Sequence, residues 1–383
     1  MRIALVAGEP SGDYLGGGLI RALSGHYPGA TFEGIGGSHM TAAGLETFHP
    51  LDDLSVMGVA EVLRHLPRLL AIRRDLRRRW ISDPPDVFIG VDAPDFNLGL
   101  ARSLRASGIP TLQYVSPTVW AWRSGRIRLI RQAVDRMLCI YPFEDEFFAR
   151  SGVDSRFVGH PLADEIALDT DHPAARASFG VDAGEALVAL LPGSRRSEIQ
   201  RLLPVFLEVA DRVAAARPAS RFVIPAATPA LQAMIEQGIA GSERAARVEV
   251  IPGQSRRVLA AADAGLIASG TATLEAMLLK CPSVMAYRVN AMTAMLARRS
   301  LRIPFFAMPN LMAGEMLMPE FVQDEANAEA ITPAILSLLD APRKRREIAG
   351  RFAELHARLR LNASEQAAAG VAGLLASRER SDA

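Results

Sequence analysis

Two carboxylates follow an apolar run in the stretch VFIGVDAPDFN, residues 87–97. Asp92 comes directly after the run, and Asp95 stands behind Pro94 at the start of a helical pattern. A carboxylate at a strand end can take the proton of an attacking alcohol, but it can equally cap a helix or bond to a turn. Asp95 has the position of an N-cap or first-turn acid, so we expect it to be structural. Asp92 closes the strand itself, so it is a candidate for chemistry, with a cap or a hydrogen bond to the glycine-rich turn as the alternative.

Small and acidic residues also follow the first apolar run of the chain, in AGEPSGDYLGG. Glu9, Ser11, Gly12 and Asp13 are candidates for contacts with a ligand, because glycines let it approach the backbone and helix amides attract anions. The spacing is not GxGxxG, and no acid closes a following strand at the usual offset. A dinucleotide site is therefore not expected.

A second strand-end motif reads LLPGSRRSEI, residues 190–199. Pro192 and Gly193 form a tight turn, Ser194 is expected to cap a helix, and Arg195 could hold a phosphate at its N-terminus. Glu198 completes a pattern that resembles a capping box. The alternative is a plain strand–turn–helix corner with a solvated arginine.

A third motif, IASGTATLE at residues 267–275, ends another apolar run. Ser269, Gly270 and Thr271 would offer backbone amides to a diphosphate at the start of a helix that carries Thr273. Glu275, one turn into that helix, could accept hydrogen bonds from both hydroxyls of a ribose. The alternative is an ordinary helix N-terminus with an acid in its first turns.

The elements that must position these motifs are short apolar strands separated by amphipathic helices, which is typical of parallel sheets covered on both faces. Strands are expected at RIALVAG, TFEGIG, VFIGVD, TLQYVSP and MLCIYP, and then at ALVALLPGS, RFVIPAA, VEVIPGQ, AGLIASG and PSVMAYR. Between them, residues 162–184 are polar and predict a linker. We expect an N-terminal domain at 1–165, a C-terminal domain at 180–340 and a helical tail at 341–383, with ligands at the strand ends that face the cleft between the domains.

Length and composition agree with two globular domains. The chain has 383 residues, of which 49% are hydrophobic and 22% charged, and its net charge of +1 carries no nucleic-acid signature. Cys139 and Cys281 lie in apolar runs and are expected to be buried, reduced thiols. The P-loop pattern is absent, and Lys280 and Lys344 are the only lysines, so Schiff-base chemistry has almost no candidate. No segment reads as a signal peptide or a spanning helix, so we expect a cytoplasmic protein.

Residues 59–80 form a basic amphipathic pattern. Its apolar members near one face are Val62, Leu63, Leu66, Leu69, Leu70, Leu76 and Trp80, and the arginines around it are Arg64, Arg68, Arg74, Arg77 and Arg78. Such a helix can bind an anionic membrane surface, or it can be a core helix with a solvated arginine face. Pro67 should interrupt or kink it. The pattern leaves both interpretations open.

Taken together, the motifs resemble one known family. LVAGEPSGD, VMGVAEVL, DVFIGVDAPDFN, YVSPTVWAW, VGHPL, LLPGSRRSEI, IASGTATLEAMLLKCP and MPNLMAGE occur in this order and look like lipid-A-disaccharide synthase over about residues 3–315. The pair DAPDFN and SPTVWAW is the most specific part of this resemblance. Pro10 is a departure, because relatives often have threonine there.

The resemblance implies an α/β protein of the GT-B architecture, with two Rossmann-like, doubly wound parallel-sheet domains facing a cleft and a helical C-terminal tail. It implies an inverting glycosyltransferase that joins UDP-2,3-diacylglucosamine to 2,3-diacylglucosamine 1-phosphate, giving a β(1→6) disaccharide monophosphate and UDP. No cofactor, metal or nucleic acid is expected, and the acylated substrates would be met at the cytoplasmic face of the inner membrane.

The same resemblance assigns roles to individual positions. Asp92 falls on the catalytic aspartate, and the N-terminal domain is expected to bind the acceptor. The donor motifs in the C-terminal domain are Gly193, Ser194 and Arg195, followed by Ser269, Gly270, Thr271 and Glu275. Trp122, Arg123 and Asn310 join the residues after the first strand as acceptor or cleft candidates. Two alternatives remain, a UDP-sugar 2-epimerase of the same architecture and a UDP-binding regulatory module.

Overall fold

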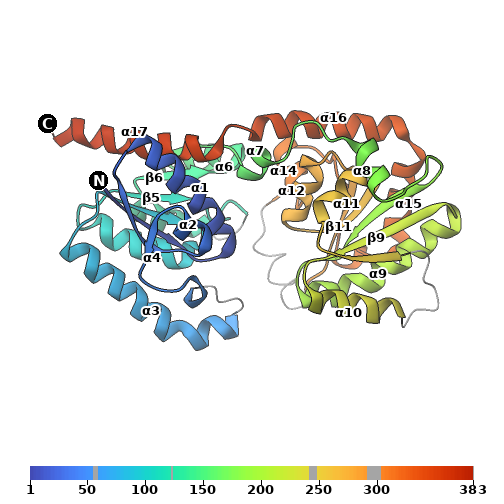
Figure 1. Ribbon diagram of the computed structural model, residues 1–383, viewed down its shortest axis with the longest axis horizontal. Helices are drawn as coiled ribbons and strands as arrows, with labels where there is room; N and C mark the ends of the chain where they lie inside the picture. The colour runs from blue at the N-terminus through green and yellow to red at the C-terminus, as the bar shows by residue number, and fades with distance from the viewer. Residues whose placement is uncertain (55–58, 122–123, 241–247, 291–302, 383) are drawn as a thin grey trace. The chain divides into compact units, whose positions relative to one another are not determined.

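The computed structural model describes residues 1–54, 59–121, 124–240, 248–290 and 303–382 (Figure 1). The chain divides into two compact units. Unit 1 comprises Met1–Asp164 and Leu359–Ala383, and unit 2 comprises Glu165–Arg358.

Unit 1 contains a seven-stranded parallel sheet with the order β3-β2-β1-β4-β5-β6-β7. Its strands are β1 Arg2–Ala7, β2 Thr31–Ile35, β3 Leu45–Thr47, β4 Val87–Val91, β5 Thr111–Tyr114, β6 Arg136–Cys139 and β7 Ser155–Phe157. In the register of the two central strands, Ile3 of β1 lies opposite Val87 of β4. The strand order reverses between β1 and β4, which is the switch point where sheets of this kind bind ligands.

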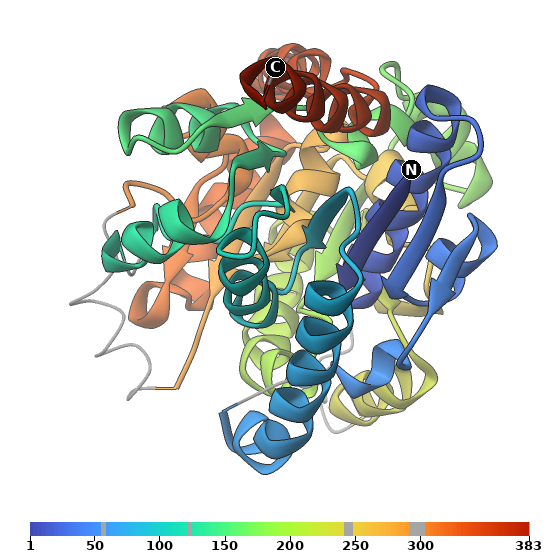
Figure 2. The same ribbon diagram turned by 90° about the vertical axis from the view of Figure 1, so that its left-hand side faces the viewer.

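Both faces of this sheet are buried. Figure 2 shows the strands with their flanking helices. Alternate residues of β1 enter different cores: Ile3 and Leu5 pack in one, and Ala4 and Val6 in the other. The first core includes side chains of α1 (Pro10–His26), α2 (Ser38–Ala42) and α17 (Ala363–Asp382). The second includes side chains of α3 (Val59–Ser82), α4 (Pro94–Arg105), α5 (Ile127–Ala133) and α6 (Pro142–Arg150).

Unit 2 contains a six-stranded parallel sheet with the order β10-β9-β8-β11-β12-β13, so its order reverses between β8 and β11. The strands are β8 Ala186–Leu191, β9 Ser220–Ala226, β10 Val248–Pro252, β11 Ala264–Ala268, β12 Ser283–Tyr287 and β13 Glu320–Val322. The helices are α8 His172–Ser178, α9 Arg196–Ala216, α10 Pro229–Ala240, α11 Ser255–Ala261, α12 Thr271–Leu278, α14 Met308–Ala313, α15 Ala328–Asp340 and α16 Pro342–Leu359. Figure 1 shows α9 and α10 side by side along this sheet, and the two helices are in contact.

The two parallel-sheet domains and the helical C-terminal stretch confirm the predicted fold class, and every predicted strand is present. Sequence analysis missed β3, β7 and β13, which are only three residues long and lie at sheet edges. The polar segment predicted as a linker contains the end of α7 (Pro161–Glu165) and all of α8. The helices after residue 341 are shared, because α16 belongs mainly to unit 2 and α17 to unit 1.

The structure also tests the amphipathic helix α3. It continues through Pro67, so the predicted interruption is wrong; an exposed proline removes one backbone donor without ending the helix. Leu76 and Trp80 are fully buried, and the indole of Trp80 donates to Glu33 Oε1 at 2.7 Å. Trp80 is therefore a core residue and is not available to a membrane surface. The side chains of Val62, Leu63 and Arg64 lie outside the described residues.

Cys139 and Cys281 are both buried and free, as predicted. Burial raises the pKa of Cys281 to about 12 and also raises the pKa of Cys139, so both thiols stay protonated near neutrality. Among the described residues, no helix has the length and apolar character needed to cross a membrane.

Candidate active sites at the two switch points

Asp92 lies at the switch point of unit 1, directly after β4. Its backbone φ is +55° and that of Ala93, the N-cap of α4, is +41°. Two successive residues with side chains in the left-handed region are unfavourable, so the surrounding structure must hold this turn in place. Turns of this kind project a side chain sharply away from the sheet.

Three hydrogen bonds hold the backbone of Asp92. Its N–H donates to the carbonyl of Tyr114 at 2.9 Å, which continues the pairing with β5. Its carbonyl accepts from Asn97 Nδ2 and from Gln113 Nε2, both at 2.8 Å. Asn97 and Gln113 are fully buried, so the backbone of the turn is fixed from below while the carboxylate stays half-buried at the surface.

The side chain of Asp92 meets the loop that follows β1. Ser11 Oγ donates to Asp92 Oδ2 at 3.2 Å, so these two predicted site residues come together. A Cβ on Gly12 would lie 3.3 Å from Cβ of Asp92, and one on Gly8 would collide with Cβ of Ala93. The two glycines therefore allow this loop to approach the Asp92 turn closely.

The other residues of this loop have different surroundings. Asp13 is buried, and its carboxylate accepts from the amides of Gly37, His39 and Met40 at 2.7–3.0 Å, so it holds the start of α2. Glu9 is exposed, and it lines an apolar pocket of about 310 Å³ whose wall includes Gly8, Ala93 and Phe96. We therefore assign Asp13 a structural role and keep Glu9 near the Asp92 turn.

The glycines that follow Asp13 in α1 serve packing. Cβ atoms on Gly16 and Gly17 would meet Met40 and His39 of α2, and one on Gly18 would meet Ser364 of α17. These three positions accommodate neighbouring helices and do not bring a ligand close to the backbone.

Asp95 lies in the first turn of α4, as predicted. Its carboxylate pairs with Arg126, and its side chain remains 80% exposed. A pair this exposed contributes little to stability.

The donor motifs meet in one pocket of unit 2, at the β8/β11 switch point. The pocket has a volume of about 300 Å³ and lies at the carboxyl ends of β8, β9 and β11. Its lining includes eight of the predicted residues: Gly193, Ser194, Arg195, Glu198, Ser269, Gly270, Thr271 and Glu275. Pro225, Ala227 and Ser255 also line it, although no motif indicated them.

Within this pocket, Glu198 occupies the start of α9. Its Oε2 accepts from the amides of Ser194 at 3.0 Å and Arg195 at 3.3 Å. The N-cap is Arg195 and not Ser194, so the predicted cap is wrong by one residue. Glu198 is the third helical residue and bonds back to the N-cap, which confirms the predicted capping box. Gly193 has φ +126°, and a Cβ there would lie 2.5 Å from that of Glu198. The Arg195 side chain is 62% exposed and can move toward a ligand.

The second donor loop begins α12. Gly270 is its N-cap with φ +141°, a conformation that favours glycine. Thr273 is fully buried, donates to the carbonyl of Gly270 at 2.8 Å and does not line the pocket, so it is a structural part of the loop. Glu275 Oε1 accepts from Arg256 Nε at 3.0 Å, and the same guanidinium donates to Glu165 at 3.1 Å. Arg256 thus orients Glu275, a role that only tertiary contacts reveal.

One of the remaining candidates, Asn310, does not join either site. Asn310 is fully buried in α14, where its amide donates to Met318 O and Glu320 Oε1 and its Oδ1 accepts from the amides of Leu317 and Met318. These four bonds use the whole side chain, so Asn310 is structural. Trp122 and Arg123 lie outside the described residues.

Near the SPTVWAW segment lies a buried acid that no motif indicated. Glu144 of α6 is buried, and its carboxylate accepts from the indole of Trp120 at 3.3 Å and the amide of Tyr141 at 3.2 Å. Burial raises the pKa of Glu144 to about 7, although these hydrogen bonds act in the opposite direction. Glu144 thus ties Trp120 to the first turn of α6.

The two parallel-sheet domains and the helical C-terminal stretch define a protein of the GT-B fold. In structure, the chain is similar to the glycosyltransferase of kitacinnamycin, with a TM-score of 0.60, 19% identity and coverage of 97% of this chain and 98% of the other. It is also similar to the UDP-GlcNAc 2-epimerase from Neisseria meningitidis bound to UDP-GlcNAc, with a TM-score of 0.64, 12% identity and coverage of 97% and 100%. At these identities the likeness shows the fold alone.

Sequence comparison gives the particular family. The model described as lipid-A-disaccharide synthetase matches residues 3–371. The lipid-A-disaccharide synthase of Alkalilimnicola ehrlichii is 51% identical and covers 97% of this chain and 98% of its own length; that of Azotobacter vinelandii is 49% identical and covers 97% of each. The chain therefore belongs to the lipid-A-disaccharide synthase family, and it is a glycosyltransferase of lipid A biosynthesis.

Proposed function

We propose that this glycosyltransferase joins UDP-2,3-diacylglucosamine to 2,3-diacylglucosamine 1-phosphate, forming a β(1→6) disaccharide 1-phosphate and UDP with inversion at the anomeric carbon. Unit 1 binds the acceptor and unit 2 binds the donor. The observation that carries the catalytic part is the turn at Asp92, whose backbone is fixed by buried partners while its carboxylate is presented at the switch point.

Asp92 acts as the general base. As the acceptor's 6-hydroxyl attacks the anomeric carbon, its proton passes to a carboxylate oxygen of Asp92, and the bond to the UDP oxygen breaks on the opposite side. Ser11 keeps the carboxylate oriented through its hydrogen bond to Oδ2. The rigid backbone keeps the oxygen in place, which is the positioning that proton transfer requires.

The unit 2 pocket holds UDP. The amides after β8 and β11 and the guanidinium of Arg195 face the diphosphate and stabilise the charge that develops on it as it leaves. Glu198 now accepts from the amides of Ser194 and Arg195, so it must yield them to an incoming phosphate oxygen. Glu275 accepts from the ribose hydroxyls, and its pairing with Arg256 leaves the second carboxylate oxygen available for them.

The enzyme works at the cytoplasmic face of the inner membrane, where acylated substrates reside. Exposed leucines on α3 support this part of the proposal: Leu66 is 40% exposed and Leu70 38%, and the same helix exposes Arg74 and Arg78. Contact with the membrane would therefore rest on leucines and arginines and not on Trp80.

The proposed function is tested by incubating the protein with each acylated glucosamine alone and with both together. We expect UDP to appear at an appreciable rate only when both are present. An epimerase would transform the UDP-sugar without the acceptor, and a regulatory module would bind it without turnover, so either outcome would contradict the proposal.

A further inference from the structure

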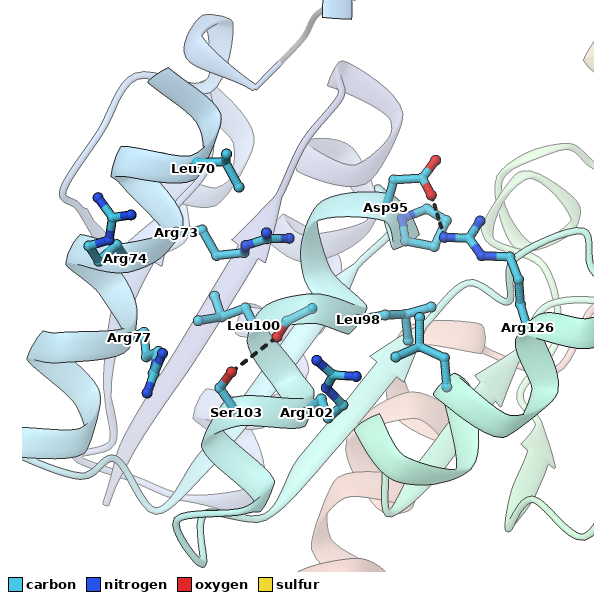
Figure 3. A pocket seen from close by; sticks show the side chains of 13 residues that line it. Leu70, Arg73, Arg74, Arg77, Asp95, Leu98, Leu100, Arg102, Ser103 and Arg126 are labelled. Atoms are coloured by element: carbon cyan, nitrogen blue, oxygen red, sulfur yellow. Dashed lines mark hydrogen bonds and ion pairs between the residues drawn. The ribbon is translucent and has the colours of Figure 1, made fainter. Parts of the chain in front are cut away.

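Five arginines line one pocket of unit 1, shown in Figure 3. The pocket has a volume of about 410 Å³ and lies between α3 and α4, with Arg126 of the 3-10 turn Ser124–Arg126 and Leu129 of α5 also in its lining. The arginines are Arg73, Arg74 and Arg77 of α3, Arg102 of α4, and Arg126. We refer to it below as the arginine pocket.

The charge of the arginine pocket is nearly unopposed. Asp95 is the one carboxylate among the described residues that line it, and Arg126 already pairs with it. Among the described residues, no carboxylate pairs with the other four guanidinium groups. Like charges held close together repel, and a bound anion would relieve that repulsion.

An amphipathic helix with a solvated basic face would present arginines from one element only. Here three elements contribute, and α4 is shaped to receive one of the side chains from α3. A Cβ on Gly99 would lie 2.5 Å from Arg73 Nη1, so the glycine makes room for this guanidinium against the helix. Figure 3 shows Arg73 reaching from α3 toward α4.

The neighbouring apolar pocket indicates what kind of anion belongs there. The two pockets share Leu70, Arg73, Pro94 and Asp95. The apolar pocket continues from them along Leu54, Leu66, Leu69 and Phe96 to Gly8 and Ala93 beside Asp92. An anion joined to acyl chains fits this pair of pockets. Nucleic acid does not, because the described lining of the arginine pocket includes no aromatic side chain on which bases could stack.

We propose that the arginine pocket binds the phosphate monoester of the acylated sugar acceptor and thereby makes the enzyme select the phosphorylated acceptor. The inference rests on the proposed function. Pro94 and Asp95 line the arginine pocket and come two and three residues after Asp92, in the first turn of α4. A single sugar can therefore present its hydroxyl to Asp92 and its phosphate to the arginines. Arginine suits this ligand because its planar fork binds phosphate oxygens in pairs.

The test compares two acceptors, 2,3-diacylglucosamine 1-phosphate and the same sugar without the phosphate. The variants are Arg102→Gln and Arg77→Gln, both at exposed positions where glutamine should not disturb folding. Arg128→Gln on α5 is the matched control, because Arg128 is exposed and does not line the pocket. Each variant is assayed in mixed micelles for kcat and KM of both acceptors and of the donor.

We expect each pocket variant to lower kcat/KM for the phosphorylated acceptor by about tenfold or more, mainly through KM. Its kcat/KM for the unphosphorylated acceptor and its KM for the donor should not change, so the preference for the phosphate shrinks. The control should keep the wild-type preference.

Unchanged preference in both pocket variants, in an enzyme whose wild type makes the disaccharide, would overturn the inference and leave the proposed function standing. If the wild type makes no disaccharide from either acceptor, the proposed function itself fails. A third outcome separates a substrate site from a lipid headgroup site. Loss of binding to phosphatidylglycerol vesicles with the acceptor preference intact would assign the arginines to the membrane surface, and the inference would be wrong.

Discussion

The switch points of the two sheets share their topology but carry opposite chemistry. In unit 1, the loops after β1 and β4 present a carboxylate, Asp92, on a backbone fixed by buried amide side chains. In unit 2, the loops after β8 and β11 present glycines, helix amides and Arg195. The first arrangement suits acceptance of a proton and the second suits capture of an anion.

The difference lies in how each loop is held. Asp92 and Ala93 adopt left-handed conformations that glycine would adopt more easily, so a side chain is retained at a strained position. In unit 2 the corresponding unusual conformations fall on glycines, Gly193 and Gly270, which leave the backbone accessible. In the proposed mechanism, one fold thus places a reactive side chain at one switch point and a binding backbone at the other.

Replacing the acid of unit 1 should have the largest effect. We expect Asp92→Asn to lower kcat by about 10²–10⁴-fold, because asparagine keeps the shape and tolerates the left-handed turn but cannot accept the proton. UDP affinity should remain near that of wild type. Steady-state rates at saturating substrates measure the first quantity and calorimetry the second. Retention of most activity would move the base to Glu9 or Asp95.

Replacing the cation of unit 2 should affect the donor. We expect Arg195→Ala to weaken donor capture or slow UDP departure by about 1.5–3 kcal/mol, because a charge-assisted contact with phosphate is lost. The measurement is kcat/KM for the UDP-sugar. Arg196→Ala is the matched control, since Arg196 is adjacent and exposed but does not line the pocket. Equal effects of the two substitutions would contradict a specific role for Arg195.

A third experiment concerns Glu144, the buried acid of unit 1. The folded-state pKa of Glu144 is about 7, above its ordinary value of 4.5, so the folded state binds the proton more tightly. Its contribution to stability is therefore present below about pH 4.5 and is lost as the pH rises through about 7. Glutamine does not titrate, so the free energy of unfolding of Glu144→Gln should not fall in this way. Relative to wild type, the variant should become more stable between pH 5 and pH 8, by on the order of 2 kcal/mol.

The midpoint of thermal unfolding at pH 5 and at pH 8 measures this gain. Glu146→Gln on the same helix is the control, because Glu146 is exposed and its replacement should give the same small difference at both pH values. A Glu144→Gln variant that keeps one constant offset from wild type would show that burial does not perturb this acid.

The smallest effect is expected at Asp95. Its pair with Arg126 is exposed, so Asp95→Asn should cost about 1 kcal/mol of stability or less, and turnover at saturating acceptor should stay largely intact. The thermal midpoint and kcat check the two parts. A loss of turnover as large as that of Asp92→Asn would remove the distinction between the two acids.

Sequence alone predicted the strands well because most are short apolar runs buried on both faces, and an apolar run is a local property of the sequence; β10, at a sheet edge and not buried, was also found by its apolar residues. It also predicted which loops meet in unit 2, since parallel strands bring their carboxyl ends to one edge. The edge strands β3, β7 and β13 escaped it, because three residues carry no periodic signal.

The partners of polar side chains were harder to predict. Asp13 and Asn310 carry the right chemistry for a ligand, but Asp13 bonds to the amides at the start of α2, and Asn310 bonds to residues 317–320. Glu198 was predicted beside a phosphate site. That its carboxylate accepts hydrogen bonds from the amides of Ser194 and Arg195 could not be predicted, because this depends on the close approach of Gly193 to Glu198. The arginine pocket is formed by residues of three elements that are apart in the sequence. Only the arginines of α3 form a recognisable sequence pattern, so the pocket could not be predicted.

The configuration of the new glycosidic bond tests the central claim most directly. If Asp92 deprotonates the acceptor while unit 2 holds the departing UDP, attack comes from the side opposite the leaving group. The account therefore predicts a 1→6 linkage whose anomeric configuration is the inverse of that in the donor, with one UDP formed per linkage, as measured by nuclear magnetic resonance of the purified product. A retained configuration, or UDP formed without a new linkage, would contradict it.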